Sequence, residues 1–351
     1  MTAAPYASMD EALEMLAAYG PDLRNGLTNH APMAVEALCA MGRPEAVMPW
    51  AERYRAGMLP RSGTRQRITR DTWRAALAQL DRAEDWSMFF REELEDAPWR
   101  EVLNRWVGQL APGICASATH GVIRVGHAAR SLAESASPQR RRELADALAS
   151  WAYAYQELPT SRSVAQGPMR PHAAIMHVAV VPPARRVFTG TITSSLEALS
   201  EFPDFAPVIE LLDVSGDPVG LVSELTDVFA RVYLANTHDV LTAIVFIHGV
   251  TSVAALGNLL PYLDDATARA ALRFAWQASC GLFAAFGSRP VPAAEIEPPR
   301  TAAATLVDMA VAHGDEHAIK FTEACLRQHT LRPSPAYLSA ALHALEILPR
   351  G

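Results

Sequence analysis

The stretch ARAALRFAWQASCGLFAAF, residues 268–286, decides the fold class. Apolar residues recur in it at spacings of three and four, which is the period of an α-helix with one buried face. The same spacing continues at 9–19, 33–41, 102–110 and 144–155. Gly20-Pro21 and Gly42 follow the first two of these stretches, as helix stops do. We therefore predict an all-α protein built as a large multi-helix bundle.

Proline-rich segments interrupt this helical pattern. Residues 156–187 are rich in Pro, Ser, Arg and Gly, and their one strand-like run begins at Val178. A segment of that length without regular structure is usually a linker or a functional lid. We expect an amino-terminal helical half, 1–155, and a carboxy-terminal helical half, 188–351, which form one compact unit around a central metal site. A second Pro-rich patch, 290–299, precedes the last helices.

Composition narrows the classes of function. The 351 residues are half hydrophobic, and the formal net charge is −7. Basic residues cluster only in the short run Arg140-Arg141-Arg142, so we expect no nucleic-acid partner. We expect no apolar run to reach the length of a membrane span, and the amino terminus is acidic where a secretory signal is basic. We therefore expect a cytoplasmic protein with no membrane partner, and its oligomeric state stays open.

The cysteines indicate no special chemistry, whereas the single lysine does. The four cysteines occur singly in apolar contexts, which favours buried free thiols. Of 31 basic residues, 30 are Arg and only Lys320 is Lys. A lysine amine can lose its proton and act as a nucleophile, whereas a guanidinium stays charged. The single lysine therefore suggests amine chemistry, with chance as the alternative.

Four of the eleven histidines each precede an apolar helical segment: His30, His120, His248 and His317. Pro32 supports a helix start near His30, because proline is tolerated in the first turn. Taken singly, each histidine is typical of a core imidazole that bonds a backbone carbonyl. Helices that each offer one inward imidazole can instead build a metal site between them.

Lys320 fits such a site. His313, His317 and Lys320 are spaced at i, i+4 and i+7, which predicts one stripe of one helix. Burial favours the neutral amine of Lys320, and this amine can react with carbon dioxide to give an anionic carbamate. Four imidazoles and one such oxygen ligand suit Fe(II), with one position left for dioxygen or substrate. The alternative is a lysine that extends to water beside an exposed histidine.

Further candidates surround these five residues. Arg124 and His127 follow His120 on one helix face, and we predict second-shell or pocket roles for both, against ordinary core or ion-pair roles. Asp315 is expected to cap the helix of His317, or to orient a histidine.

Other signatures are weak or missing. The dipeptide His238-Asp239 occurs in helical metal-dependent phosphohydrolases, but the other spaced ligands of that class are not evident. Neither GxGxxG nor GKS/GKT is present, so we expect no Rossmann domain and no flavin.

At these positions the sequence resembles the questin oxidase-like family, helical proteins that act on anthraquinones and related polyketides. The stretches that carry the resemblance are Asn29-His30-Ala-Pro-Met, Thr119-His120-Gly-Val-Ile-Arg-Val-Gly-His127, Phe246-Ile-His248-Gly-Val-Thr251 and Asp315-Glu-His317-Ala-Ile-Lys320. Family members are oxygenases that open a quinone ring. They are either Baeyer-Villiger type oxidases that use NADPH or iron dioxygenases with four histidines and a carboxylated lysine.

The resemblance implies that the four histidines and Lys320 are the metal ligands. Apart from the resemblance, we predict that Asn29, His127, Asp315 and His313 lie in the second shell or the substrate pocket. This chain departs from fungal members in having Arg124 where they have a histidine, and in being shorter. The substrate and the reaction type therefore stay open.

Three hypotheses follow. In the first, the protein is a non-haem iron-dependent oxygenase that cleaves or oxygenates a ring of a polycyclic aromatic polyketide, with dioxygen as co-substrate. Lys320 then acts as a carbamate, and Arg124 holds a substrate oxyanion. In the second, it is an NADPH-dependent Baeyer-Villiger type oxidase without metal, whose histidines are acid-base groups. In the third, it is a helical scaffold or a metal-dependent hydrolase.

Overall fold

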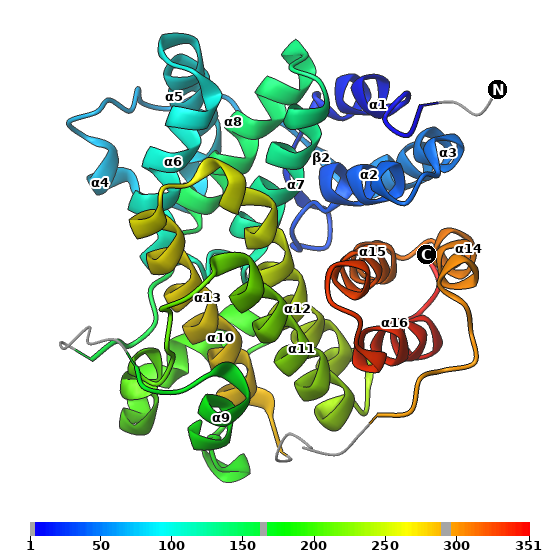
Figure 1. Ribbon diagram of the computed structural model, residues 1–351. Helices are drawn as coiled ribbons and strands as arrows, with labels where there is room; N and C mark the ends of the chain where they lie inside the picture. The colour runs from blue at the N-terminus through cyan, green and yellow to red at the C-terminus, as the bar shows by residue number, and fades with distance from the viewer. Residues whose placement is uncertain (1–3, 162–166, 289–295) are drawn as a thin grey trace.

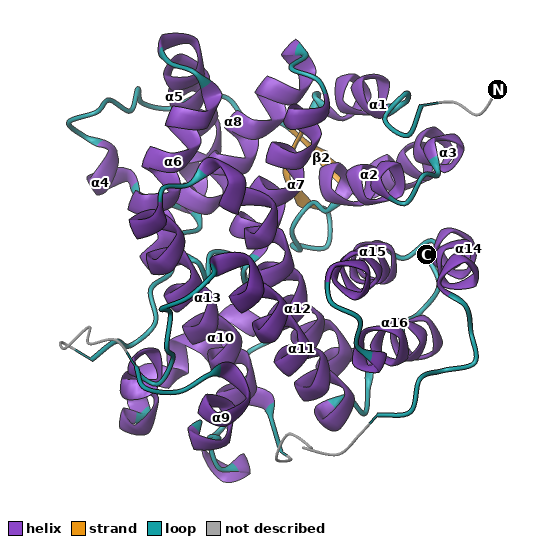
Figure 2. Cartoon of the chain, in the orientation of Figure 1, coloured by secondary structure: helices purple, strands orange, loops and turns teal. Residues whose placement is uncertain are grey.

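Helices make up nearly all the secondary structure of residues 4–161, 167–288 and 296–351, which the computed structural model describes (Figure 2). The longer helices are α1 (Met9–Leu16), α2 (Ala31–Ala40), α3 (Pro44–Tyr54), α5 (Ala83–Asp96), α6 (Trp99–Leu110), α7 (His120–Glu134), α8 (Pro138–Tyr153), α11 (Pro218–Asn236), α12 (Val240–Leu259), α13 (Asp265–Phe286), α14 (Ala303–His313), α15 (Glu316–Leu331) and α16 (Pro335–Ile347). The prediction of an all-α fold is confirmed.

Short elements join these helices. They are α4 (Trp73–Ala76), α9 (Pro171–Ala174), α10 (Ile192–Glu197) and the 3-10 turns η1 (Arg55–Gly57), η2 (Leu80–Arg82), η3 (Ala111–Gly113), η4 (Ile175–His177), η5 (Pro183–Arg185), η6 (Ala198–Glu201), η7 (Pro203–Glu210) and η8 (Leu260–Tyr262). Two strands, β1 (Tyr19–Leu23) and β2 (Met58–Pro60), pair antiparallel. We did not predict this small sheet, and Gly20-Pro21, expected as a helix stop, lies within β1.

Helix ends follow local sequence signals. Pro32 lies in the first turn of α2, as predicted, and Gly42 after its end has a φ of +72°. The Asp264 carboxylate accepts the Thr267 backbone N–H at 2.8 Å and caps α13. These caps place the helix starts near the predicted positions.

Four helices form a closed ring at the centre of the molecule. α2 packs against α7, α7 against α12, α12 against α15, and α15 against α2. Figure 1 shows this ring with α8 and α5 beyond α7, α11 and α13 beside α12, and α14 and α16 beside α15. Three of the four ring helices contain one of the histidines singled out in the sequence, and the fourth, α2, begins directly after one of them.

Helix α12 corrects one expectation. The segment Val240–Tyr262, which is α12 with η8, is 23 residues long, and its most apolar 18-residue window has a mean hydropathy of 2.0, enough by length and composition to cross a membrane. Of its most apolar window, 78% is buried inside the protein, as in the core helix of a soluble protein. A helix packed on all sides needs apolar residues all round, which raises its hydropathy to that of a membrane span.

The Pro-rich segment at 156–187 packs onto the helices where it is described. The Val181 N–H donates to the Ala284 carbonyl of α13 at 2.8 Å, and Met169 forms an isolated bridge with Leu212. One hydrophobic cluster contains side chains from Met33 to Leu348, including Leu158 and Val178. Residues 162–166 of this segment, and 290–295 of the second Pro-rich patch, lie outside the described residues.

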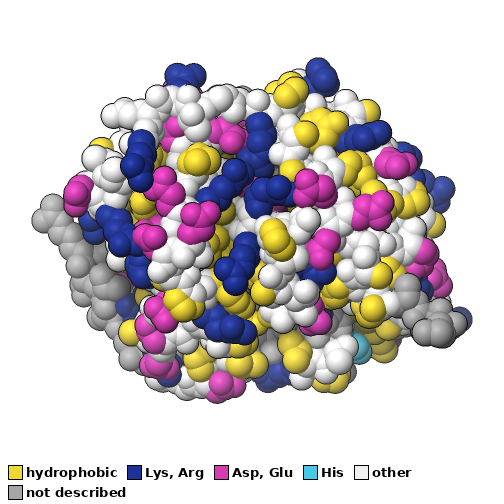
Figure 3. All heavy atoms as spheres, turned by 90° about the horizontal axis from the view of Figure 1, so that it is seen from above, with side chains coloured by type: hydrophobic (Ala, Val, Ile, Leu, Met, Phe, Trp, Pro, Cys, Tyr) yellow, Lys and Arg dark blue, Asp and Glu magenta, His cyan; other side chains and the backbone are white. Residues whose placement is uncertain are grey.

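The surface carries mixed charge. On the face seen in Figure 3, acidic and basic side chains are interspersed with scattered hydrophobic ones rather than gathered into one patch of a single sign. That face therefore presents no continuous basic stripe of the kind that binds phosphate backbones.

Candidate metal centre

The structure brings the four predicted histidines together. Ring nitrogens of His30, His120 and His317 lie within 4.8 Å of one another. His248 joins them, because its Nε2 lies 3.2 Å from Nε2 of His120. All four side chains are buried. A cluster of four imidazoles from four helices can offer several nitrogen ligands to one ion.

Three of the four histidines lie at helix starts. His30 is the residue before α2, His120 is the first residue of α7, and His317 is the second residue of α15. His248 instead lies within α12. Helix amino termini carry partial positive charge, so three of them converging on one point favour anionic groups there.

Two of the imidazoles have their tautomers fixed by backbone carbonyls. Nδ1 of His120 bonds to the Ser117 carbonyl oxygen, and Nδ1 of His248 bonds to the Ile244 carbonyl oxygen at 2.6 Å. Because a carbonyl oxygen only accepts, each Nδ1 carries the proton and each Nε2 presents a lone pair. The two Nε2 atoms therefore face each other at 3.2 Å as two acceptors, and a cation between them would satisfy both.

The fit to a metal ion rests on this pair. Two imidazole nitrogens that bind one ion at about 2.1 Å and at roughly right angles lie about 3 Å apart. A shared proton is less favourable, because burial lowers the pKa of His120 to about 3 and that of His248 well below its ordinary value. Neutral imidazoles are the form that binds metals.

A strained turn precedes His120. Ser117, Ala118 and Thr119 have φ angles of +47°, +55° and +73°, the left-handed region that non-glycine residues avoid. This turn places the Ser117 carbonyl on the His120 ring. Strain of this kind persists only where the surrounding structure enforces it, and it is often found at functional sites.

Asn29 anchors the start of α2. Its Nδ2 donates to the Gly20 carbonyl of β1 at 2.9 Å, and its Oδ1 accepts the Ala31 backbone N–H at 2.9 Å. The side chain therefore caps the helix and ties it to the small sheet. This holds the neighbouring His30 in place, so Asn29 acts on the site through the backbone.

His30 has an unmatched ring atom. Its buried Nδ1 makes no hydrogen bond with the described residues, and Oε1 of Glu316 lies 3.6 Å away. Its backbone N–H donates to the Tyr54 hydroxyl at 3.1 Å. Burial lowers the pKa of His30 well below its ordinary value, and the charge of Lys320 lowers it further. A buried polar atom without a partner is unusual and is consistent with a ligand site.

Lys320 lies beside the histidines, with only 2% of its surface exposed. Burial lowers the pKa values of His30, His120 and His248, and the charge of Lys320 lowers each of them further. Burial lowers the pKa of Lys320 to about 8, while the charges of Glu316 and Asp315 oppose that shift. An appreciable fraction of the amine is therefore unprotonated near neutral pH.

The predicted stripe of His313, His317 and Lys320 is wrong. α14 ends at His313, Gly314 has a φ of +80°, and α15 starts at Glu316 with Asp315 as its cap. His313 Nε2 lies 3.2 Å from the Leu348 carbonyl oxygen, and its Nδ1 accepts the Asp315 backbone N–H at 3.4 Å. The three residues cannot share a helix because the left-handed glycine ends the first one.

Asp315 behaves as the predicted cap. One of its carboxylate oxygens accepts the backbone N–H groups of His317 and Ala318, both at 2.9 Å. The same oxygen lies 3.8 Å from Nδ1 of His317. Asp315 therefore sets the position of His317 mainly through the helix start.

Arg124 and His127 turn toward different helices. Nε and Nη2 of Arg124 donate to Glu143 of α8 at 2.7 and 2.9 Å, and Nδ1 of His127 lies 2.6 Å from Glu36 of α2. The two therefore do not point at one site, although both begin from the helix that starts at His120. Each side chain turns toward the carboxylate that it binds, Glu143 or Glu36. Sequence spacing alone did not indicate these two partners.

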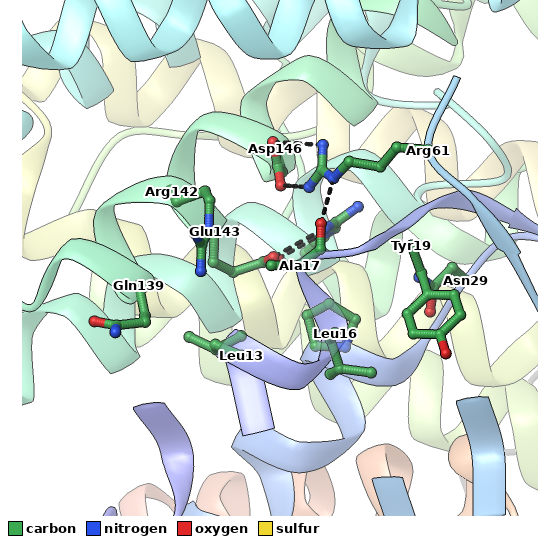
Figure 4. Close-up of a pocket in the computed structure, with 12 residues that line it drawn as sticks. Leu13, Leu16, Ala17, Tyr19, Asn29, Arg61, Gln139, Arg142, Glu143 and Asp146 are labelled. Atoms are coloured by element: carbon green, nitrogen blue, oxygen red, sulfur yellow. Dashed lines mark hydrogen bonds and ion pairs between the residues drawn. The ribbon is translucent and has the colours of Figure 1, made fainter. Parts of the chain in front are cut away.

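A small polar pocket, partly open to solvent and with room for about one water molecule, lies between α1, β1 and α8 (Figure 4). Asn29 and Arg124 are among the residues that line it, and Arg61 forms an ion pair with Asp146 there. The other side chains that line it are Leu13, Leu16, Ala17, Tyr19, Pro32, Gln139, Arg142 and Glu143. Because its arginines are paired with carboxylates, it presents a mixed polar wall rather than an apolar slot.

Sequence reasoning missed several functional neighbours. Glu36 and Glu143 are buried carboxylates inside helical patterns, where an acid usually faces water. Tyr54, whose hydroxyl accepts the His30 backbone N–H, stacks on Trp50 with ring centroids 4.7 Å apart. The dipeptide His238-Asp239 is explained by local structure, because Asp239 caps α12 through Thr242.

The chain also matches a known family. The family model described as questin oxidase-like matches residues 27–325, a range that begins before His30 and ends after Lys320. No curated protein gives a match. Since the matched range covers most of the 351 residues, the chain belongs to the questin oxidase-like family.

Proposed function

We propose that this protein is a non-haem iron oxygenase that cleaves or oxygenates a ring of an anthraquinone-like polyketide. Family membership implies an oxidoreductase of the oxygenase type that acts on a small molecule. The observation that carries the iron hypothesis is the pair of Nε2 atoms of His120 and His248, 3.2 Å apart with both Nδ1 atoms bonded to carbonyls.

The proposed ligands are His30, His120, His248, His317 and Lys320. Burial keeps the first three imidazoles neutral, so their nitrogens are available without competition from protons. Imidazoles with one anionic oxygen suit Fe(II). Bound there, ferrous iron would supply a binding place for dioxygen and for an ionised substrate oxygen.

Lys320 contributes as a carbamate in this proposal. Its neutral amine attacks the carbon of carbon dioxide, an N–C bond forms, and one proton leaves the nitrogen to solvent, which gives an anionic carbamate. The lowered pKa of Lys320 supplies the neutral amine, and three converging helix starts favour the anion. The negative charge would offset that of a divalent ion.

Arg124 has a narrower role than the sequence suggested. Its ion pair with Glu143 occupies the Nε–H and one N–H of Nη2, so the two N–H groups of Nη1 and the second one of Nη2 are left to bind a substrate oxygen. It lines the polar pocket together with Asn29, the residue before His30. We therefore place Arg124 at the rim, where it would orient a polar substituent of the substrate.

The first test is metal content, measured by elemental analysis on protein purified with and without ferrous iron and bicarbonate. We expect about one iron per chain in the wild type and a loss of most of it in Lys320→Ala. Lys320→Arg keeps a positive charge but cannot form a carbamate, so it should also lose the metal. Iron retained in both lysine variants would contradict the role of Lys320.

A matched control separates the site from general damage. His313→Ala removes a buried imidazole on the neighbouring helix that contacts Leu348, so it should keep iron, whereas His317→Ala should lose it. Oxygen uptake with anthraquinone substrates should need iron and no NADPH. Metal-free wild type with NADPH-dependent turnover would instead favour the Baeyer-Villiger type oxidase.

A further inference from the structure

A second buried cluster is centred on Glu36 of α2. It lies further along the helices that start at the histidines. The Glu36 side chain has no exposed surface and accepts hydrogen bonds from three side chains. Nδ1 of His127 lies 2.6 Å away, Nε and Nη2 of Arg130 lie 2.7 and 2.5 Å away, and the Tyr6 hydroxyl lies 2.5 Å away. Although burial opposes ionisation, Arg130 and His127 hold the pKa of Glu36 well below its ordinary value.

Arg130 extends this cluster to a third helix. Its Nη1 donates to Oε1 of Glu323 in α15 at 2.5 Å, and Arg327 donates to the same oxygen at 3.0 Å. Glu323 is also buried. The cluster therefore links α2, α7 and α15 through charge-assisted hydrogen bonds.

These are the same three helices that start at the histidines. Glu36 follows His30 by six residues, and Glu323 follows His317 by six, about 9 Å along each helix. Arg130 follows His120 by ten residues, about 15 Å along α7. The helices are therefore held together at two levels, first at the histidines and then at Glu36.

We propose that Glu36 is a positioning residue, which sets the spacing of α2, α7 and α15 and so the separation of His30, His120 and His317. This rests on the proposed metal site. Removing the Glu36 carboxylate leaves the buried Arg130 guanidinium with one charged partner fewer. α2 and α7 must then move, either to let water reach Arg130 or to separate from each other. A shift between helix axes moves the histidines at their ends.

The test compares Glu36→Gln with Glu93→Gln. Glu93 is a matched control, because it is buried in α5, away from the histidines, and binds Arg70, Arg105 and Trp106. The probe is Co²⁺, titrated into metal-free protein and followed by visible absorption. We expect Glu36→Gln to weaken Co²⁺ binding about 10- to 100-fold and to change the spectrum. Glu93→Gln should change neither, even where it lowers the melting temperature equally.

Wild-type affinity and spectrum in folded Glu36→Gln would overturn the proposal. Where that variant does not fold, Tyr6→Phe removes one bond to Glu36 and keeps every charge, and it should still change the Co²⁺ spectrum. An unchanged spectrum in that variant overturns the proposal too.

A failure of the proposed metal site can be distinguished from a failure of the positioning role of Glu36. A wild type that binds no metal contradicts the proposed function, and positioning is then measured from the imidazole ¹⁵N resonances of the metal-free protein. Glu36→Gln should shift those of His30 and His120 while Glu93→Gln does not, and unshifted resonances overturn the positioning role.

Discussion

Three consecutive left-handed residues before His120 give a prediction at the scale of single residues. Ala118 has a φ of +55°, a conformation that costs an L-residue about 1–2 kcal/mol and glycine almost nothing. Glycine also loses about 0.5–1 kcal/mol more entropy on folding. We therefore expect Ala118→Gly to raise the free energy of unfolding by up to about 1 kcal/mol, measured by urea unfolding.

The control lies two residues earlier. Ala116 is buried in the same turn without a positive φ, so Ala116→Gly should lower stability by about 1 kcal/mol. Equal losses in both variants would show that the left-handed turn stores no strain. No glycine marks this turn, which is why the sequence did not predict it.

Residue spacing also explains one success and one error around His317. Asp315 was predicted as a cap because an acid before an apolar segment satisfies free backbone N–H groups, and it does so. His313 was placed on the same helix because periodicity was read across Gly314. Gly314 ends α14 in a left-handed conformation, and Asp315 caps the start of α15. These two neighbouring residues therefore separate the two helices.

Close packing of α7 on α12 gives a prediction at the scale of elements. A Cβ on Gly126 of α7 would lie 2.5 Å from the Ala255 carbonyl oxygen and 2.8 Å from its Cβ, both on α12. These helices carry His120 and His248. We expect Gly126→Ala to separate them and to lower the free energy of unfolding by about 1–3 kcal/mol, measured by urea unfolding.

Gly108 of α6 is the control for that substitution. A Cβ there meets Thr267 at 3.6 Å, an ordinary contact, and the residue is exposed. Gly108→Ala should therefore raise stability by about 1 kcal/mol through helix propensity alone. If Gly126→Ala is more stable as well, the contact between α7 and α12 leaves room for a Cβ at residue 126, and the prediction is wrong.

Helices were more predictable than their arrangement. Periodicity found α2 and α13 because their apolar spacing is local, whereas the ring of α2, α7, α12 and α15 depends on contacts between distant segments. The four histidines were singled out by a repeated local pattern and by the family resemblance. Their shared position could not be deduced from spacing, because it depends on packing of the four helices.

At the scale of the whole molecule, buried carboxylates tie distant segments together. Glu36 joins the amino-terminal segment to α7, and Glu323 joins α15 to the same arginine, Arg130. Such links are invisible in sequence, since a buried acid and an exposed acid look alike there. They stabilise the arrangement only while ionised, so stability should depend on pH.

Asp227 of α11 allows that dependence to be measured. Burial opposes its ionisation, but His172, Ser334 and Arg231 from three segments lower its pKa to about 2, from an ordinary value of 3.8. A lowered pKa means that the unfolded chain binds the proton more tightly. The stabilisation is therefore complete above about pH 5 and is lost as the pH falls from about 4 to 2.

We expect Asp227→Asn to lower the free energy of unfolding by about 2 kcal/mol at pH 7, measured by urea unfolding. The difference from the wild type should shrink as the pH falls from 4 toward 2, because the native carboxylate becomes protonated there. Asp71→Asn, at an exposed position, should show no such pH-dependent difference. A gap that stays constant from pH 7 to pH 3 would mean that Asp227 stabilises the fold by shape and hydrogen bonding rather than by its charge.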